Sequence, residues 1–208
     1  GTGPKAGGPL YLPRFLAEAD PVRDDEGQPV GTGEVASAFA GLDAAHWLAE
    51  PDRTARLRAA LRGGAADAVA AAAALDPGPV DLPGPTGESN QYELTALGRV
   101  LCLGPGETVL AQAVQALAAG NTVVAVAPDA VRAVDRLVKA GLPVAAFDGV
   151  LAPEALGTLD VAGVAYGGSD RLASIRRALA GREGPIVRLV RGRIAPGDQR
   201  FPAEADIR

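Results

Sequence analysis

From Gln91 onward, short apolar runs alternate with longer segments in which apolar residues recur every three or four positions. The short runs predict strands, and they are Tyr92–Leu103, Thr122–Ala127, Val144–Phe147, Val161–Tyr166 and Ile186–Val190. The longer segments predict helices, and they are Glu107–Ala119, Asp129–Ala140, Pro153–Leu159 and Ser169–Ala180. Buried strands separated by helices are typical of a parallel sheet covered on both faces. Right-handed crossovers then give an α/β, Rossmann-like, doubly wound fold of about five strands.

Three details of the helices follow from the same pattern. The helix over residues 129–140 is expected to turn Val131, Val134, Leu137 and Val138 toward the core. Gly120 and Gly141 directly follow two of the helices and are expected to end them. Ser169 stands at the start of the last helix, where its side chain is expected to cap the first turn.

The first part of the chain has a different pattern. Residues 1–16 are rich in Gly and Pro and then apolar, and residues 17–33 are polar and predict a linker. Residues 34–76 are largely helical in period, with Ala44, Trp47 and Leu48 on one face. We therefore divide the chain into an end segment 1–16, a linker 17–33, a helical segment 34–76 and a Rossmann-like domain 77–208.

Composition narrows the class of protein. The 208 residues carry a net charge of −5, and the arginines are scattered among acids, so nucleic-acid binding is not expected. One cysteine excludes an internal disulfide. The apolar runs are too short to span a bilayer, and no secretory leader is apparent. We expect a soluble, cytoplasmic protein, with a membrane-peripheral parent left open.

In a Rossmann-like domain a dinucleotide would bind at the first strand–helix turn. In this chain that turn reads Leu103-Gly104-Pro105-Gly106-Glu107. Gly104 and Gly106 match two glycines of a dinucleotide-binding turn, but Val109 occupies the third position. Glu107 places an acid where a pyrophosphate needs bare backbone N–H groups. A tight structural turn is favoured over a nucleotide site.

The sequence offers few other residues that could act in catalysis or bind a metal. Cys102 lies within an apolar strand, and a buried structural role is favoured over a reactive thiol. His46 is the one histidine of the chain and offers no metal set. The sequence therefore predicts no catalytic residue and no metal site.

Two stretches carry a resemblance to a known family. Residues 1–16 (GTGPKAGGPLYLPRFL) resemble the end of a glutamate-semialdehyde dehydrogenase module, and residues 82–103 (LPGPTGESNQYELTALGRVLCL) resemble the long forms of proline utilization A. Those bifunctional proteins join proline dehydrogenase to glutamate-semialdehyde dehydrogenase. Their long forms add a C-terminal domain of aldehyde-dehydrogenase-like fold, and they usually continue into a tail beyond the position of Arg208.

The resemblance also implies what this chain lacks. Val126, or Ala125 if the alignment slips by one, stands where an active aldehyde dehydrogenase has a ribose-binding Lys. Arg191-Gly192-Arg193 replaces the segment with the acid/base Glu, and no nucleophile motif is present. Vestigial cofactor-binding candidates are Gly104, Gly106, Gly168 and Ser169.

The expected function is a non-catalytic C-terminal domain that supports the dehydrogenase module, assembly and intermediate channelling in such an enzyme. No cofactor is expected in this chain, whereas the resemblance implies FAD and NAD in the parent. Partners would be the parent's dehydrogenase modules, and a homo-oligomer is possible. Interface candidates are Lys5, Gly7, Gly8, Tyr11, Phe15, Pro85, Thr86, Glu88 and Asn90. The alternative is an independent nucleotide-binding protein that uses Gly104, Gly106 and Ser169.

Overall fold

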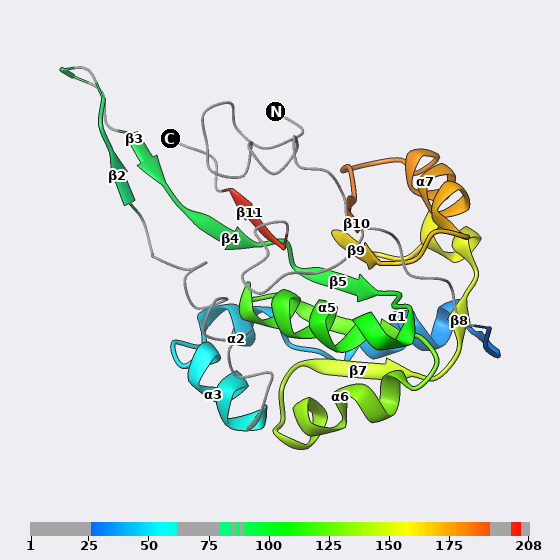
Figure 1. The fold of residues 1–208 in the computed structure, drawn as a ribbon. Helices are drawn as coiled ribbons and strands as arrows, with labels where there is room; N and C mark the ends of the chain where they lie inside the picture. Colours follow the sequence, from blue (N-terminus) through cyan, green and yellow to red (C-terminus); the bar gives the residue numbers. More distant parts are fainter. Residues whose placement is uncertain (1–25, 62–79, 85, 88–89, 192–200, 205–208) are drawn as a thin grey trace.

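The structure, a computed structural model, describes residues 26–61, 80–84, 86–87, 90–191 and 201–204. At its centre is a five-stranded parallel sheet (Figure 1). The strands are β5 (Arg99–Cys102), β6 (Thr122–Val126), β7 (Val144–Phe147), β9 (Gly163–Tyr166) and β10 (Arg188–Arg191). Their order in space is β10-β9-β5-β6-β7, and every pair is parallel. The predicted fold class is therefore confirmed.

The strand order reverses beside β5. The chain runs from β5 outward through β6 to β7, and then returns to place β9 on the other side of β5. In an open parallel sheet this reversal leaves a crevice at the carboxyl ends of the two central strands, where ligands usually bind. Here those strands are β5 and β9, so the turns that follow Cys102 and Tyr166 define the place to examine.

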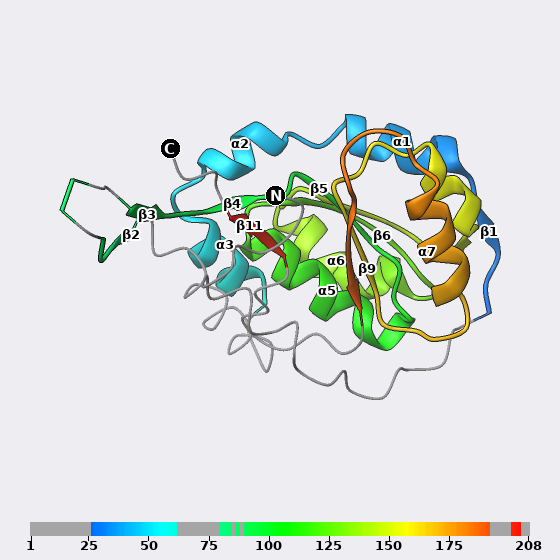
Figure 2. The ribbon, with the colours of Figure 1, turned by 90° about the horizontal axis from the view of Figure 1, so that it is seen from above.

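Helices cover both faces of the sheet (Figure 2). One face packs against α5 (Gly106–Ala118) and α6 (Ala130–Lys139), and α3 (Arg53–Ala60) packs against these two helices. The other packs against α1 (Thr32–Ala40), the short 3-10 helix η2 (Pro153–Gly157) and α7 (Leu172–Ala180). Successive residues of β5 alternate between these layers, since Val100 and Cys102 belong to the first and Leu101 to the second.

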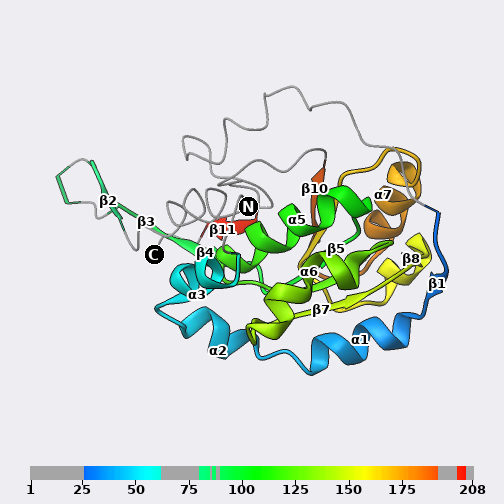
Figure 3. The same cartoon turned by 60° about the horizontal axis from the view of Figure 1, so that its bottom comes forward.

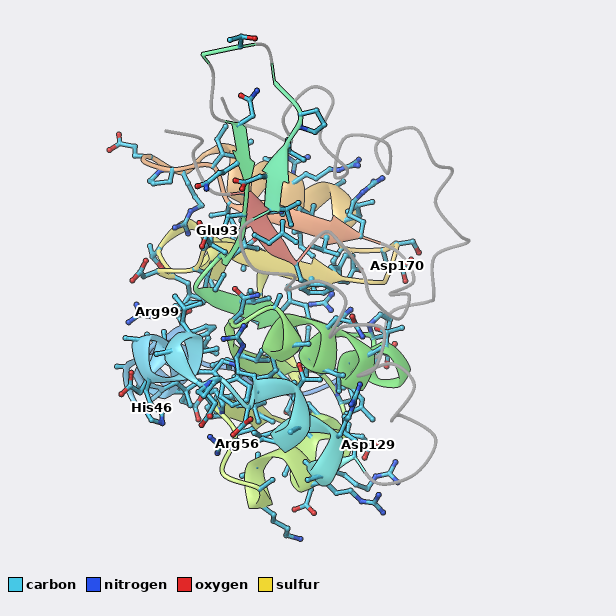
Figure 4. All side chains as sticks on the ribbon, turned by 90° about the vertical axis from the view of Figure 1, so that its left-hand side faces the viewer. His46, Arg56, Glu93, Arg99, Asp129 and Asp170 are labelled. Atoms are coloured by element: carbon cyan, nitrogen blue, oxygen red, sulfur yellow. The ribbon has the colours of Figure 1, made fainter. Side chains whose placement is uncertain are left out.

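The helical segment is attached to the Rossmann-like unit by α2 (Ala44–Ala49) and α3. Trp47 is 1% exposed, and its Nε1 donates a hydrogen bond of 2.9 Å to the carbonyl of Leu117 in α5. The Arg56 guanidinium lies over the Trp47 ring, 5.5 Å from its centroid, and also pairs with Glu50 at 2.8 Å. Figure 4 shows Arg56 and His46 on these two helices. The helical segment thus shares one core with the sheet.

Helix α1 begins at Thr32, just inside the predicted linker, and its Val35 and Phe39 are buried in the second layer. Immediately before it, β1 (Pro29–Val30) pairs in parallel with β8 (Val150–Leu151). The division of the chain into four parts stays a prediction, but α1 packs on the five-stranded sheet and β1 is paired with β8.

Three details of the predicted helices are wrong. Val131 and Val138 are 47% and 48% exposed, because α6 turns the stripe Ala130, Val134 and Leu137 toward the sheet and leaves those two valines on its flank. Ser169 does not cap α7, which begins at Leu172 with Arg171 as its N-cap residue. The Ser169 hydroxyl instead donates to Asp170 Oδ1 at 2.8 Å.

The predicted helix ends are confirmed at Gly120 and Gly141, which have φ of +83° and +67°. The last predicted strand begins later than expected: β10 starts at Arg188, and Ile186 is 74% exposed.

A two-stranded hairpin projects from the body of the molecule (Figure 3). It consists of β2 (Val80–Leu82) and β3 (Asn90–Tyr92), which pair antiparallel. The chain continues from β3 into β4 (Leu94–Ala96), and β4 pairs antiparallel with β11 (Pro202–Glu204). Val80 and Leu82 are 38% and 43% exposed, so the hairpin presents apolar side chains to solvent. Among the described residues, no helix has the length and hydropathy needed to cross a membrane.

Candidate functional site

The turn that follows β5 is the candidate nucleotide site. Gly104 has φ of +70°, and its peptide bond to Pro105 is cis. Gly106 begins α5, so the N-terminus of a thirteen-residue helix lies at the place where a dinucleotide pyrophosphate would bind. Sequence reasoning located this turn correctly.

This turn is hydrogen-bonded to the turn that follows β9. The carbonyl of Gly104 accepts a hydrogen bond of 2.7 Å from the N–H of Gly167. Gln112, from the second turn of α5, binds both backbone polar groups of Gly104. Its Oε1 accepts from the Gly104 N–H at 3.1 Å, and its Nε2 donates to the Gly104 carbonyl at 2.9 Å. Gln112 is 0% exposed, and these hydrogen bonds supply the partners that its buried amide needs.

The glycines serve this contact between the turns. A Cβ on Gly104 would lie 2.8 Å from the Cβ of Ala127, and a Cβ on Gly167 would lie 3.1 Å from Thr108 Oγ1 and 3.3 Å from the Gly104 carbonyl. Their small size allows protein backbone to approach protein backbone. In a dinucleotide site, glycines of this kind let backbone approach a phosphate instead.

Sequence reasoning missed Gln112 and Gly167. The signal for Gln112 was available, because it is a polar residue on the inward face of a helix made mainly of Ala, Val and Leu. A buried amide needs partners for both of its polar atoms, and the nearest glycine-rich turn supplies them.

The end of β6 lacks the lysine that the resemblance leads us to expect as a ribose-binding group. Ala125 and Val126 are 0% and 1% exposed and pack into the two core layers. Asp129, the first exposed acid after this strand, has φ of 59° and lies 3.6 Å from Arg132. Its position and that of Asp170, which follows β9, are shown in Figure 4.

Residues at the two ends of the turn after β9 contact one another. Gly168 is buried and Ser169 is half-buried. The Tyr166 hydroxyl accepts a hydrogen bond of 3.0 Å from the Arg171 N–H, and the Arg171 guanidinium lies 5.3 Å from the Tyr166 ring centroid. These contacts hold the start of α7 against the end of β9.

The two remaining residues that could carry chemistry, Cys102 and His46, lie on different elements of the fold. Cys102 is fully buried, and burial raises the pKa of its thiol, so the reactive thiolate is disfavoured. His46 is exposed on α2, and its backbone N–H donates to Asp43 Oδ1 at 2.9 Å. Within the part of the chain that the structure describes, no three His, Cys, Asp or Glu residues gather as a metal site would require.

The interface candidates lie mostly outside the described residues. This holds for Lys5, Gly7, Gly8, Tyr11, Phe15, Pro85 and Glu88. Thr86 is exposed near the tip of the hairpin, and Asn90 is half-buried at the start of β3. These two positions lie on the hairpin, and the interface itself stays a prediction.

Comparison with known proteins identifies the relatives of this chain. It is 35% identical over 198 residues to the bifunctional protein PutA of Rhizobium meliloti and 36% identical over 200 residues to that of Salmonella typhimurium. Each match covers 90% of this chain. The chain is homologous to the C-terminal region of PutA proteins. It spans 14% of the length of these PutA relatives.

Solved structures agree with this relationship. The proline utilization A structure from Bradyrhizobium japonicum superimposes with a TM-score of 0.65 at 29% identity, covering 80% of this chain and 22% of that one. An aldehyde dehydrogenase from Brucella melitensis matches with a TM-score of 0.61 at 18% identity, over 78% of this chain and 44% of that one. The second likeness shows the aldehyde dehydrogenase fold alone. No family model matches the chain.

Proposed function

We propose that this chain is a non-catalytic C-terminal part of a bifunctional proline-catabolic enzyme, where it supports the dehydrogenase module, assembly and channelling of the intermediate. The homology to PutA supports the kind of parent. The observation that carries the non-catalytic role is the closed turn at the sheet's reversal, where Gly104 is hydrogen-bonded to both Gly167 and Gln112.

The residues at this turn do not fit NAD. A pyrophosphate would need free backbone N–H groups, but the Gly104 N–H already donates to a buried side chain. The ribose-binding lysine implied by the resemblance is replaced at the end of β6 by Ala125 or Val126, which are apolar and buried. FAD and NAD would therefore be bound by the rest of the parent enzyme, as its relationship to PutA and aldehyde dehydrogenases suggests.

Catalysis by this chain is further disfavoured by Cys102 and Arg191. The thiol is enclosed in the first core layer, and Arg191 stands where the resemblance places the segment of the acid/base Glu. An arginine remains protonated and cannot act as a general base at neutral pH.

The experiment is a deletion of the segment that corresponds to residues 80–208 from the parent polypeptide. Coupled conversion of proline to glutamate should become slower or show a lag, while the proline dehydrogenase step measured alone should persist. Unchanged coupled activity together with unchanged thermal stability would reject the proposal.

The alternative is an independent nucleotide-binding protein. It is supported by the N-terminus of helix α5, which lies where the strand order of the sheet reverses. Calorimetric titration of the 208-residue chain with NAD, NADP and ATP separates the two functions. Micromolar binding of any of them would favour the alternative.

A further inference from the structure

A groove of about 540 Å³ lies between α7 and the edge strand β10. One side is formed by Arg176, Leu179 and Ala180 of α7, and the other by Leu189 and Arg191 of β10. The turn between these elements, with Gly184, Pro185, Ile186 and Val187, closes one end. The groove is separate from the turn at Gly104, because β9 and β10 extend the sheet away from β5 on this side.

The floor of the groove is apolar and its margin exposes a large aliphatic side chain. Ile186 is 74% exposed, the largest exposure among the large hydrophobic residues of the described chain. Leu179 and Leu189 pack against the second core layer but are only partly buried. An aliphatic side chain held this far into water is stabilised when a partner covers it.

The groove is also lined with positively charged side chains. Its charged lining residues are all arginines. The Arg182 Nη1 donates to the carbonyls of Leu156 and Leu159, and the second of these bonds is 2.7 Å long. Carbonyls are neutral acceptors, so the guanidinium keeps its net charge. Arg176 is exposed on α7. Such a groove favours a partner with a carboxylate.

The edge of the sheet determines the shape of that partner. The Arg188 N–H donates to the Ala162 carbonyl at 3.0 Å, so Arg188 and Val190 direct their backbone groups toward β9. By the alternation of a strand, Leu189 directs its N–H and carbonyl away from β9, and β10 is the last strand of this sheet among the described residues. An edge strand of this kind accepts an added extended segment.

We propose that this groove, which we call the α7–β10 groove, binds an extended segment of the dehydrogenase part of the same polypeptide. The segment adds alongside β10 through the backbone of Leu189, covers Ile186 with an apolar side chain, and directs a carboxylate toward Arg176 and Arg182. This inference rests on the proposed function. Two observations favour this occupant. The groove is lined by arginines, and this chain spans only 14% of the length of its relatives, so their remaining length can supply such a segment.

Hydrogen–deuterium exchange tests the proposal on two proteins, the 208-residue chain and the natural polypeptide that contains the dehydrogenase part. We expect the backbone amides of residues 186–191 to exchange at least about tenfold more slowly in the longer protein, because an added strand would protect the Leu189 N–H. Arg176→Glu in the longer protein should remove most of this protection. Arg177→Glu is the matched control, since Arg177 is the next exposed residue of α7 but does not line the groove.

Each outcome of the exchange experiment either supports or overturns the proposed groove assignment. Equal exchange of residues 186–191 in the two proteins overturns the proposal, as does an equal effect of Arg176→Glu and Arg177→Glu. Protection that rises with protein concentration would identify a second copy of the chain as the occupant and would also overturn it. If deletion of residues 80–208 impairs coupled activity while exchange at the groove is unchanged, the proposed function stands and only the groove assignment fails.

Discussion

The buried amide of Gln112 is predicted to hold the turn after β5 closed. We consider Gln112→Met, which keeps an unbranched side chain of similar length and a good helix former but removes both polar atoms. The substitution leaves the Gly104 N–H without its acceptor in a fully buried place. The Gly104 carbonyl keeps its hydrogen bond from Gly167, so one orphaned donor is the main cost.

An orphaned buried donor costs about 1–3 kcal/mol, and the loss of the second amide bond adds about 1 kcal/mol. We therefore expect Gln112→Met to lower the free energy of unfolding by about 2–4 kcal/mol, which is about 4–16 °C in Tm for a chain of this size. Urea unfolding followed by circular dichroism measures the first quantity, and a thermal melt measures the second. The Gly104 amide should also exchange faster with deuterium.

Gln91→Met is the matched control. The Gln91 amide donates to Asp81 at 3.0 Å, but both residues lie on the exposed hairpin, so the same change of side chain should cost less than about 0.5 kcal/mol. A loss below about 0.5 kcal/mol for Gln112→Met as well would refute the argument that this amide closes the turn.

Three further results are expected. Trp47→Phe should lower the free energy of unfolding by about 2 kcal/mol, because it leaves a cavity and removes the donor to the Leu117 carbonyl; urea unfolding measures this. Cys102 should react with a thiol reagent only as fast as the chain opens, since burial raises the pKa of its thiol; as the chain has one cysteine, absorbance of the released thiolate reports it directly. The pKa of Glu50 is lowered by the backbone N–H of Asp52 and by Arg56, so its stabilising effect is present at neutral pH and is lost as the pH falls below the ordinary range of a glutamate. Stability measured from pH 7 to pH 3 should therefore depend less on pH in Glu50→Gln.

Each of these expectations has a control and a contradicting result. His46→Ala, an exposed neighbour of Trp47, should change stability by less than about 0.5 kcal/mol, and an equal loss for both variants would argue against the Trp47 anchor. Labelling of Cys102 in the native chain as fast as that of a free thiol would contradict its enclosure. Identical pH dependence of wild type and Glu50→Gln would show that Glu50 has the same pKa folded and unfolded.

The candidate site was predicted in part. The sequence located the turn at Gly104 and Gly106, and it correctly indicated that Cys102 is buried. It did not reveal how the turn is closed. The hydrogen bond from Gly167 to Gly104 joins two turns that become neighbours only when β9 pairs with β5, and sequence periodicity carries no information about that pairing.

The helices likewise have some features that the sequence predicted and others that it did not. Gly120 and Gly141 end α5 and α6 as predicted, because a positive φ is a local property of the residue. Ser169 was wrongly expected to cap α7, because α7 begins only at Leu172 and the Ser169 hydroxyl donates to Asp170 instead. Where a helix begins depends on backbone geometry, which residue type leaves open.

By itself the sequence determined the alternation of strands and helices and the helix-ending glycines. These are local properties, since the spacing of apolar residues and the chemistry of single side chains are contained in a few consecutive positions. Only the tertiary structure decided the strand order, the exposure of Val131 and Val138, the closing of Gly104 by Gln112 and Gly167, and the α7–β10 groove. Each of these depends on which distant segments meet, and that follows from the packing of the whole sheet.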